Sequence, residues 1–196
     1  ENVEICLQET NDLCTSTNSS GQFLLEGLPD AQNVTVFLDR EGLFPTALHH
    51  YTADLEPPWD KTLLSQGTMQ TVANRVDETL EPRMGHMSFM VHQAHFREGK
   101  VAQTSGISFR IEPEQGSSLY YLNTLQLPNP ELSETTGAGG GGALNIPPGA
   151  YELVLENTGG PCERIIGWDF PTGTRIPFAI YEGRSTYFDV LCPQQD

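Results

Sequence analysis

GALNIPPG at residues 142–149 leads, one residue later, into YELVL at residues 151–155. The same pattern occurs earlier, where GQFLLEGLP at residues 21–29 precedes VTVFL at residues 34–38. In both places a glycine turn and a short apolar strand come before a proline corner and an alternating strand. Period-two alternation after a proline corner is typical of a half-buried strand that enters a β-sandwich. The repeat therefore predicts an all-β fold with two related modules in tandem.

Turn residues and apolar spacing divide the chain into three parts. Residues 1–54 are expected to form the first β-sandwich module, with strands at Val3–Leu7, Phe23–Leu25, Val34–Asp39 and Phe44–Tyr51. Residues 55–83 are expected to be a connector with a short amphipathic helix, for which Ser65 is a candidate N-cap and Pro82 a stop signal.

Residues 84–196 are expected to form the second β-sandwich module, because eight candidate strands follow one another at the spacing of a complete sandwich. The strands are predicted at Met87–Val91, Ile107–Ile111, Leu119–Leu122, Gly142–Ile146, Tyr151–Glu156, Cys162–Trp168, Arg175–Ile180 and Tyr187–Leu191. The glycine-rich run at residues 137–142 lacks the Lys-Ser/Thr ending of a phosphate loop, so we expect a mobile loop tip there.

The charge of the chain excludes some partners. With 10 Lys and Arg against 26 Asp and Glu, the formal net charge is −16, which repels phosphate backbones and anionic membranes. Nucleic acid is therefore not an expected partner, whereas calcium or a basic protein is compatible with the acidic surface. No apolar run approaches the roughly 20 residues that span a bilayer, so we expect no membrane insertion by this chain.

The four cysteines predict two disulfides. Cys6 and Cys14 are eight positions apart and fit a hairpin staple, while Cys162 and Cys192 flank the last predicted strands. The Cys-x2-Cys spacing of a zinc site is absent. We therefore expect an oxidising location: secreted, periplasmic or on the cell surface.

Several stretches resemble the carboxypeptidase regulatory-like domains of the transthyretin-like β-sandwich class. The first module carries them at Val3–Leu7, Thr17–Phe23, Gly27–Pro29 and Glu41–Pro45, and the second, more loosely, at Gly106–Ile111, Ile146–Tyr151 and Tyr187–Cys192. The resemblance implies two tandem transthyretin-like modules joined by the connector helix. It also implies a non-catalytic accessory role in a secreted or surface protein, with protein or glycan partners.

The chain departs from the family pattern at its start. The sequence opens almost directly on Asn2–Ile5, so the first module is expected to lack its first strand. An unpaired strand edge invites a strand from another copy or another protein, which would make the chain a self-assembling subunit. The alternatives are that a strand was removed as dispensable or that the second module covers the edge.

A histidine- and methionine-containing strand offers a metal site. If residues 86–92 are extended, His86, Ser88, Met90 and His92 share one face, and two imidazoles with a thioether suit copper. His95 or the pair His49-His50 would add ligands. Methionines also fill sandwich cores, however, and exposed histidines usually bind nothing.

Catalysis is not expected. His95 and Glu98 form the His-x-x-Glu spacing of metallocarboxypeptidases, but no histidine follows to complete the zinc site. Exposed aromatics are the other candidates for binding, because Trp59 and Trp168 lie at ends of predicted elements where they could stack on sugars or anchor peptides. The sequence thus predicts a non-catalytic surface interaction protein that needs no cofactor. The alternatives are a copper-binding surface protein and an accessory domain of a secreted hydrolase.

Overall fold

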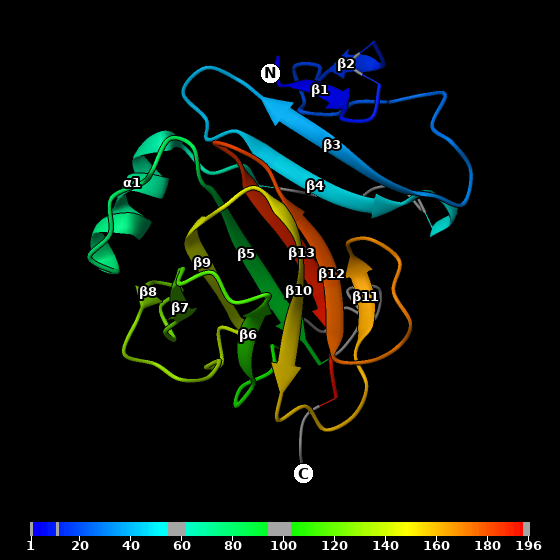
Figure 1. Ribbon diagram of the computed structural model, residues 1–196. Coiled ribbons are helices and arrows are strands. Elements are labelled where there is room, and N and C mark those ends of the chain that lie inside the picture. Colours follow the sequence, from blue (N-terminus) through cyan, green and yellow to red (C-terminus); the bar gives the residue numbers. More distant parts are fainter. Residues whose placement is uncertain (1, 11, 55–61, 94–102, 194–196) are drawn as a thin grey trace.

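The computed structural model describes residues 2–10, 12–54, 62–93 and 103–193. Its strands are β1 (Glu4–Leu7), β2 (Cys14–Ser16), β3 (Asn33–Asp39), β4 (Thr46–Tyr51), β5 (Gly85–His92), β6 (Ser108–Glu112), β7 (Ser118–Leu122), β8 (Pro128–Asn129), β9 (Gly140–Ile146), β10 (Gly149–Glu156), β11 (Glu163–Ile166), β12 (Arg175–Ile180) and β13 (Ser185–Leu191). The helices among the described residues are α1 (Gln66–Arg75) and the short 3-10 helix η1 (Thr52–Asp54). The predicted all-β class is confirmed (Figure 1).

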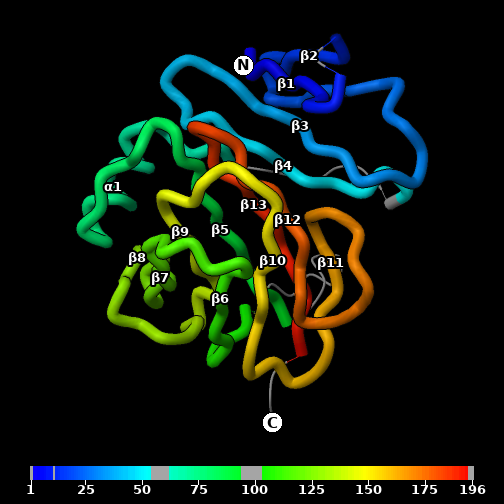
Figure 2. The backbone as a smooth tube through the Cα atoms, in the orientation of Figure 1, coloured from blue at the N-terminus to red at the C-terminus, as the bar shows by residue number. Residues whose placement is uncertain are grey.

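Ten strands form one continuous sheet. Its order is β2-β1-β3-β4-β13-β5-β9-β7-β8, and β11 pairs with β13 at the side of this path. The last strand of the chain, β13, runs parallel to both of its neighbours, β4 and β5 (Figure 1). Its backbone lies between theirs (Figure 2). Backbone pairing therefore continues between residues 1–54 and residues 84–196, and the division of the chain into separate modules stays a prediction.

The second sheet has three strands in the order β12-β10-β6 and packs on one face of the large sheet, which we call the sandwich face. The main core lies between the two sheets and contains the fully buried rings of Phe89, Phe178 and Phe188. The Pro147-Pro148 corner lies between β9 and β10, so the chain passes there from one sheet to the other.

The opposite face of the large sheet, which we call the helix face, is covered by α1 and by the chain before β3. Ser65 caps α1 as predicted, because its side chain accepts the Thr68 N–H at 3.0 Å. The helix ends at Arg75, several residues before Pro82. Asp77 takes a left-handed conformation, with φ 57°, and the Glu78 N–H bonds back to the Ala73 carbonyl, which together close a helix terminus.

The strand predicted at Phe23–Leu25 is wrong. These residues are extended without ladder pairing, and Phe23, Leu25 and Leu28 pack on the apolar cluster of β1, β3 and β4 while Leu24 is 70% exposed. The edge of β3 that such a strand would join is already paired with β1. The alternating pattern of Phe23–Leu25 arises because these side chains pack on a sheet, although the segment is not itself a strand of that sheet.

The mobile loop tip predicted at residues 137–142 is also wrong. Gly140–Gly142 belong to β9, which runs buried between β5 and β7. A Cβ atom at Gly142 would lie 2.5 Å from the Tyr120 hydroxyl oxygen, and one at Gly141 would lie 2.8 Å from the Tyr120 carbonyl oxygen. Only glycine, which has no Cβ atom, leaves room at positions 141 and 142 for the atoms of the neighbouring strands.

Both predicted disulfides are present. Cys6 and Cys14 lie directly opposite each other on β1 and β2, with Cα atoms 4.1 Å apart. Cys162 and Cys192 are fully buried in the main core. Two disulfides are typical of a protein from an oxidising compartment. Among the described residues, none of the helices is long and apolar enough to cross a membrane.

Candidate functional site

The predicted alternation of β5 is confirmed. The main core receives Met87, Phe89 and Val91 from this strand. The helix face carries the candidate metal ligands His86, Met90 and His92, together with Ser88. The alternation thus predicts correctly which side chains of β5 lie in the main core, and the candidate ligands lie on the opposite face.

The candidate ligands are not brought together. Residues six positions apart in an extended strand have Cα atoms about 20 Å apart, so His86 and His92 are too distant to ligate one ion at about 2 Å. In the part of the chain that the structure describes, no group of three His, Cys, Asp or Glu side chains could hold a metal ion. His95 and Glu98 lie outside the described residues.

His86 is a packing group at the start of β5. Its ring is 2% exposed and lies 5.5 Å from the ring of Phe44, measured between centroids. Its Nδ1 accepts the Asn145 N–H at 3.2 Å. Burial lowers the pKa of His86 to about 4, so the ring is neutral at pH 7.

His49 and His50 point to opposite faces of β4, since neighbouring residues of a strand alternate. On the sandwich face, His49 Nε2 accepts the Ala179 N–H at 3.0 Å, and Nδ1 lies 2.9 Å from Thr35 Oγ1. Burial lowers the pKa of His49 to about 3. Burial, and then the charge of Arg164, lower the pKa of His50 to about 4. The pair cannot act as one metal-binding unit.

A row of polar side chains crosses the helix face near the end of β5. The Tyr187 hydroxyl donates to Asp189 Oδ1 at 2.5 Å, and His92 Nε2 lies 3.6 Å from the same oxygen. Asp189 and His92 are each 3% exposed. Burial and the Asp189 charge raise the pKa of Tyr187, so its proton stays on the phenol.

A cavity of about 220 Å³ lies between α1 and the helix face. Apolar and aromatic side chains from β7, from α1 and from the chain that precedes each of β4 and α1 form its walls: Phe44, Leu64, Val72, Tyr120 and Leu122. The β7–β8 turn contributes Gln126, which is exposed, as are Thr62 and Thr68 on the side of α1. These exposed side chains mark the rim through which the cavity meets solvent.

Two central strands supply the floor of the cavity. Ser88 and Met90 come from β5, and Ser185 and Tyr187 come from β13. The parallel register sets Tyr187 beside Ser88, so all four side chains lie on the same face. The floor therefore adds hydroxyl groups to walls that are mostly apolar, which is the usual chemistry of a small-ligand site.

Trp168, one of the two aromatic residues predicted to bind a partner, contacts β3 and β4. Its Nε1 donates to the Val34 carbonyl at 3.1 Å, and its ring stacks on His49 with centroids 4.1 Å apart. The ring is only partly exposed. These contacts make Trp168 a link between the chain after β11 and the β3–β4 pair. Trp59 lies outside the described residues.

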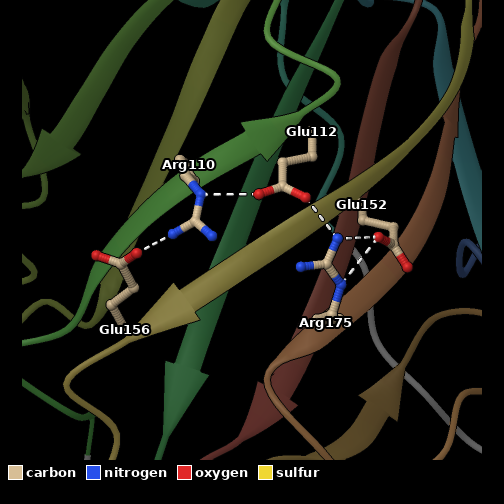
Figure 3. A network of polar contacts seen from close by, with 5 residues as sticks. All are labelled: Arg110, Glu112, Glu152, Glu156 and Arg175. Atoms are coloured by element: carbon tan, nitrogen blue, oxygen red, sulfur yellow. Dashed lines mark hydrogen bonds and ion pairs between the residues drawn. The ribbon is translucent and has the colours of Figure 1, made fainter.

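The outer face of the small sheet carries a charge network (Figure 3). Glu112 accepts from both Arg110 and Arg175, while Glu156 pairs with Arg110 and Glu152 pairs with Arg175. Hydrogen bonds from Arg175 and then from Arg110 lower the pKa of Glu112. Because both arginines are about half exposed, at 47% and 50%, the network marks a solvated face and not a site.

Comparison with known proteins adds little. No family model and no curated protein matches the chain. Among solved structures, the chain is similar to the Bacillus anthracis TIE protein at 10% sequence identity, with a TM-score of 0.33 over 98% of this chain. The chain spans about a third of that protein's length, 34%.

Sequence reasoning missed the cavity and Ser185. The alternation of STYFDVL at residues 185–191 would have placed Ser185, Tyr187 and Asp189 on one face. No local pattern, however, tells which strands will lie beside β13, and the cavity exists only because β13 lies next to β5 under α1.

Proposed function

We propose that this chain is a non-catalytic binding module that works outside the cytoplasm and receives its ligand in the cavity between α1 and the helix face. The cavity is the observation that carries the proposal, because it combines apolar walls, a few hydroxyl groups and an opening to solvent. The two disulfides support an extracytoplasmic location.

The finer architecture belongs to the same proposal. Two tandem transthyretin-like units joined by α1 are consistent with the proline corner that leads into β10 and with a β1–β4 group that has its own apolar cluster. Members of the resembled class are accessory modules, which fits a binding role without catalysis. Proteins of one fold serve many functions, so the binding role rests on the cavity and not on the fold.

We place the ligand in the cavity and not at a strand edge. Self-assembly by strand addition needs an open edge, and β4 offers none along Thr46–Leu48 because β13 pairs with it there. The strands that end the two sheets are β2, β8, β6 and β12, and β2 and β8 are only three and two residues long. The edge of β12 contains Pro177, which has no N–H to donate, and the neighbouring Ala179 N–H is bonded to His49. Proline and satisfied donors are common protections against strand addition.

The test is a titration of the 15N-labelled protein with small neutral ring compounds, followed by backbone amide shifts in NMR spectra. We expect saturable shifts confined to α1, β5, β7 and β13. Val72→Phe fills the cavity from α1 and should abolish them, whereas Gln70→Phe, at an exposed position of the same helix, should leave them unchanged. Absence of saturable shifts with every compound, or shifts that persist in Val72→Phe, would contradict the proposal.

A further inference from the structure

We propose that the cavity selects a small, uncharged ring that carries a hydroxyl or carbonyl group, and that the Ser185 hydroxyl is the group that recognises it. This inference rests on the proposed function, since it names the ligand class of the same cavity. It depends on the size of the cavity, on the absence of charge from its lining and on two hydroxyl groups of its floor.

Ser185 is the central observation. The residue is 7% exposed and lines the cavity, and its backbone N–H is already bonded to the Pro45 carbonyl at 2.9 Å. Among the residues that the structure describes, none pairs with its hydroxyl. Its oxygen is not one of the fully buried, unpaired polar atoms of the described residues, so it stays accessible to solvent through the cavity. A ligand that covers this hydroxyl without accepting or donating a hydrogen bond would leave it unpaired, at a cost of about 1–3 kcal/mol.

Three neighbouring hydroxyls are satisfied, whereas those of Ser185, Ser88 and Tyr120, which all line the cavity, have no partner among the described residues. Thr46 Oγ1 donates to the Phe44 carbonyl at 3.0 Å, Thr186 Oγ1 donates to the Ala179 carbonyl at 2.8 Å, and Tyr187 donates to Asp189. Ser88, on the adjacent strand, resembles Ser185 because its hydroxyl also has no partner among the described side chains. Both serine residues line the floor of the same cavity, so one ligand can form a hydrogen bond with either hydroxyl.

The lining excludes charged ligands. None of the described residues that line the cavity is an Asp, Glu, Lys, Arg or His. An ion would lose its hydration there without gaining a counter-charge, which is strongly unfavourable. A neutral molecule avoids this cost and gains from the apolar walls.

The volume sets the size of the ligand. A cavity of about 150 Å³ in a protein core binds benzene. The cavity here, at about 220 Å³, therefore has room for one six-membered ring with one or two small substituents. A polar substituent would reach the serine hydroxyls on the floor while the ring contacts the apolar walls.

The experiment compares p-cresol with p-xylene, two rings of nearly equal shape that differ in one hydroxyl, by NMR titration of the full chain. We expect p-cresol to bind about tenfold more tightly, as one hydrogen bond to a buried hydroxyl predicts. Ser185→Ala should bring the two affinities within about threefold by weakening p-cresol alone. Ser185→Thr keeps the hydroxyl and should keep the preference. Ser133→Ala, at an exposed position, should change nothing.

The outcomes separate this inference from the proposed function. Equal binding of both compounds to the unaltered protein would overturn the inference and leave the cavity as a general apolar site. A preference for p-cresol that survives in Ser185→Ala would overturn the role of Ser185. Failure of both compounds to bind at the cavity would overturn the inference and the proposed function together.

Discussion

Acidification from pH 7 to pH 5 should destabilise this protein strongly, because three buried histidines must stay neutral in the folded chain. His49, His50 and His86 have pKa values of about 3, 4 and 4, against an ordinary value of 6.5. A group whose pKa is lower in the folded chain stabilises the fold above its unfolded pKa. That stabilisation is lost as the pH falls from 6.5 toward 4, where the unfolded chain binds the extra proton.

The magnitude follows from proton linkage. At pH 5 each of these imidazoles is almost fully protonated when unfolded and almost fully neutral when folded. Between pH 7 and pH 5, each lowers the free energy of unfolding by about 2 kcal/mol, and the three together by about 6 kcal/mol. Since single domains have free energies of unfolding of about 5–15 kcal/mol, the loss is a large part of the total.

Urea unfolding at pH 7, 6 and 5, followed by far-UV circular dichroism, measures this loss. His86→Gln keeps a neutral acceptor for the Asn145 N–H and should reduce the pH-dependent loss by about 2 kcal/mol. Gln70→His adds an exposed histidine on α1 and should leave it unchanged. A total loss below about 1 kcal/mol, or an unaltered pH dependence in His86→Gln, would refute the reasoning.

Three further predictions concern stability and redox chemistry. Gly142→Ala should lower the free energy of unfolding by about 3 kcal/mol or more in urea titrations, because its Cβ would overlap the Tyr120 hydroxyl, whereas Gly137→Ala, with no atom within 4 Å, should change it by less than about 0.5 kcal/mol. A mild reductant should open the Cys6–Cys14 disulfide, in which Cys14 is exposed, before the fully buried Cys162–Cys192, as alkylation and peptide mass spectrometry would reveal; the reverse order would contradict this. Arg175→Ala should shift the free energy of unfolding by less than about 1 kcal/mol, since its ion pairs are half exposed, and a larger shift in the urea midpoint would show that the network is more than a solvated surface.

Local signals in the sequence predicted the elements whose causes are local. Ser65 caps α1 because its side chain reaches an amide three residues away, and β5 alternates because successive side chains of any strand point to opposite faces. The Cys6–Cys14 disulfide was predicted for a similar reason, since residues 6 and 14 fit a hairpin, whereas Cys162 and Cys192, 30 positions apart, were paired because they flank the last predicted strands.

Features that depend on distant partners could not be predicted. The insertion of β13 between β4 and β5 joins the two ends of the chain, and no local pattern encodes it. The glycines of β9 look like a flexible loop in the sequence, because the reason for them lies in other strands. Groups of β5 and β7 approach them closely, such as the Met87 carbonyl oxygen at Gly142 and the Tyr120 carbonyl oxygen at Gly141. Phe23–Leu25 alternate like a strand but find the edge of β3 taken by β1.

The candidate site shows the same limit. Sequence reasoning selected the face of β5 that lines the cavity, but it did so for metal binding, because His86 and His92 share a face whether or not they are close. Ser88 and Ser185 are unremarkable in sequence. They become candidates only when the parallel register and α1 place both hydroxyls in one cavity.

The most direct test of the central claim is the measurement of intermolecular nuclear Overhauser effects between p-cresol and the methyl groups of the protein. The account predicts contacts from the ring protons to the methyls of Val72, Met90 and Leu122, which line the cavity from three different elements. Contacts restricted to methyl groups elsewhere, such as that of the exposed Leu24, or no contacts at saturating p-cresol, would contradict it.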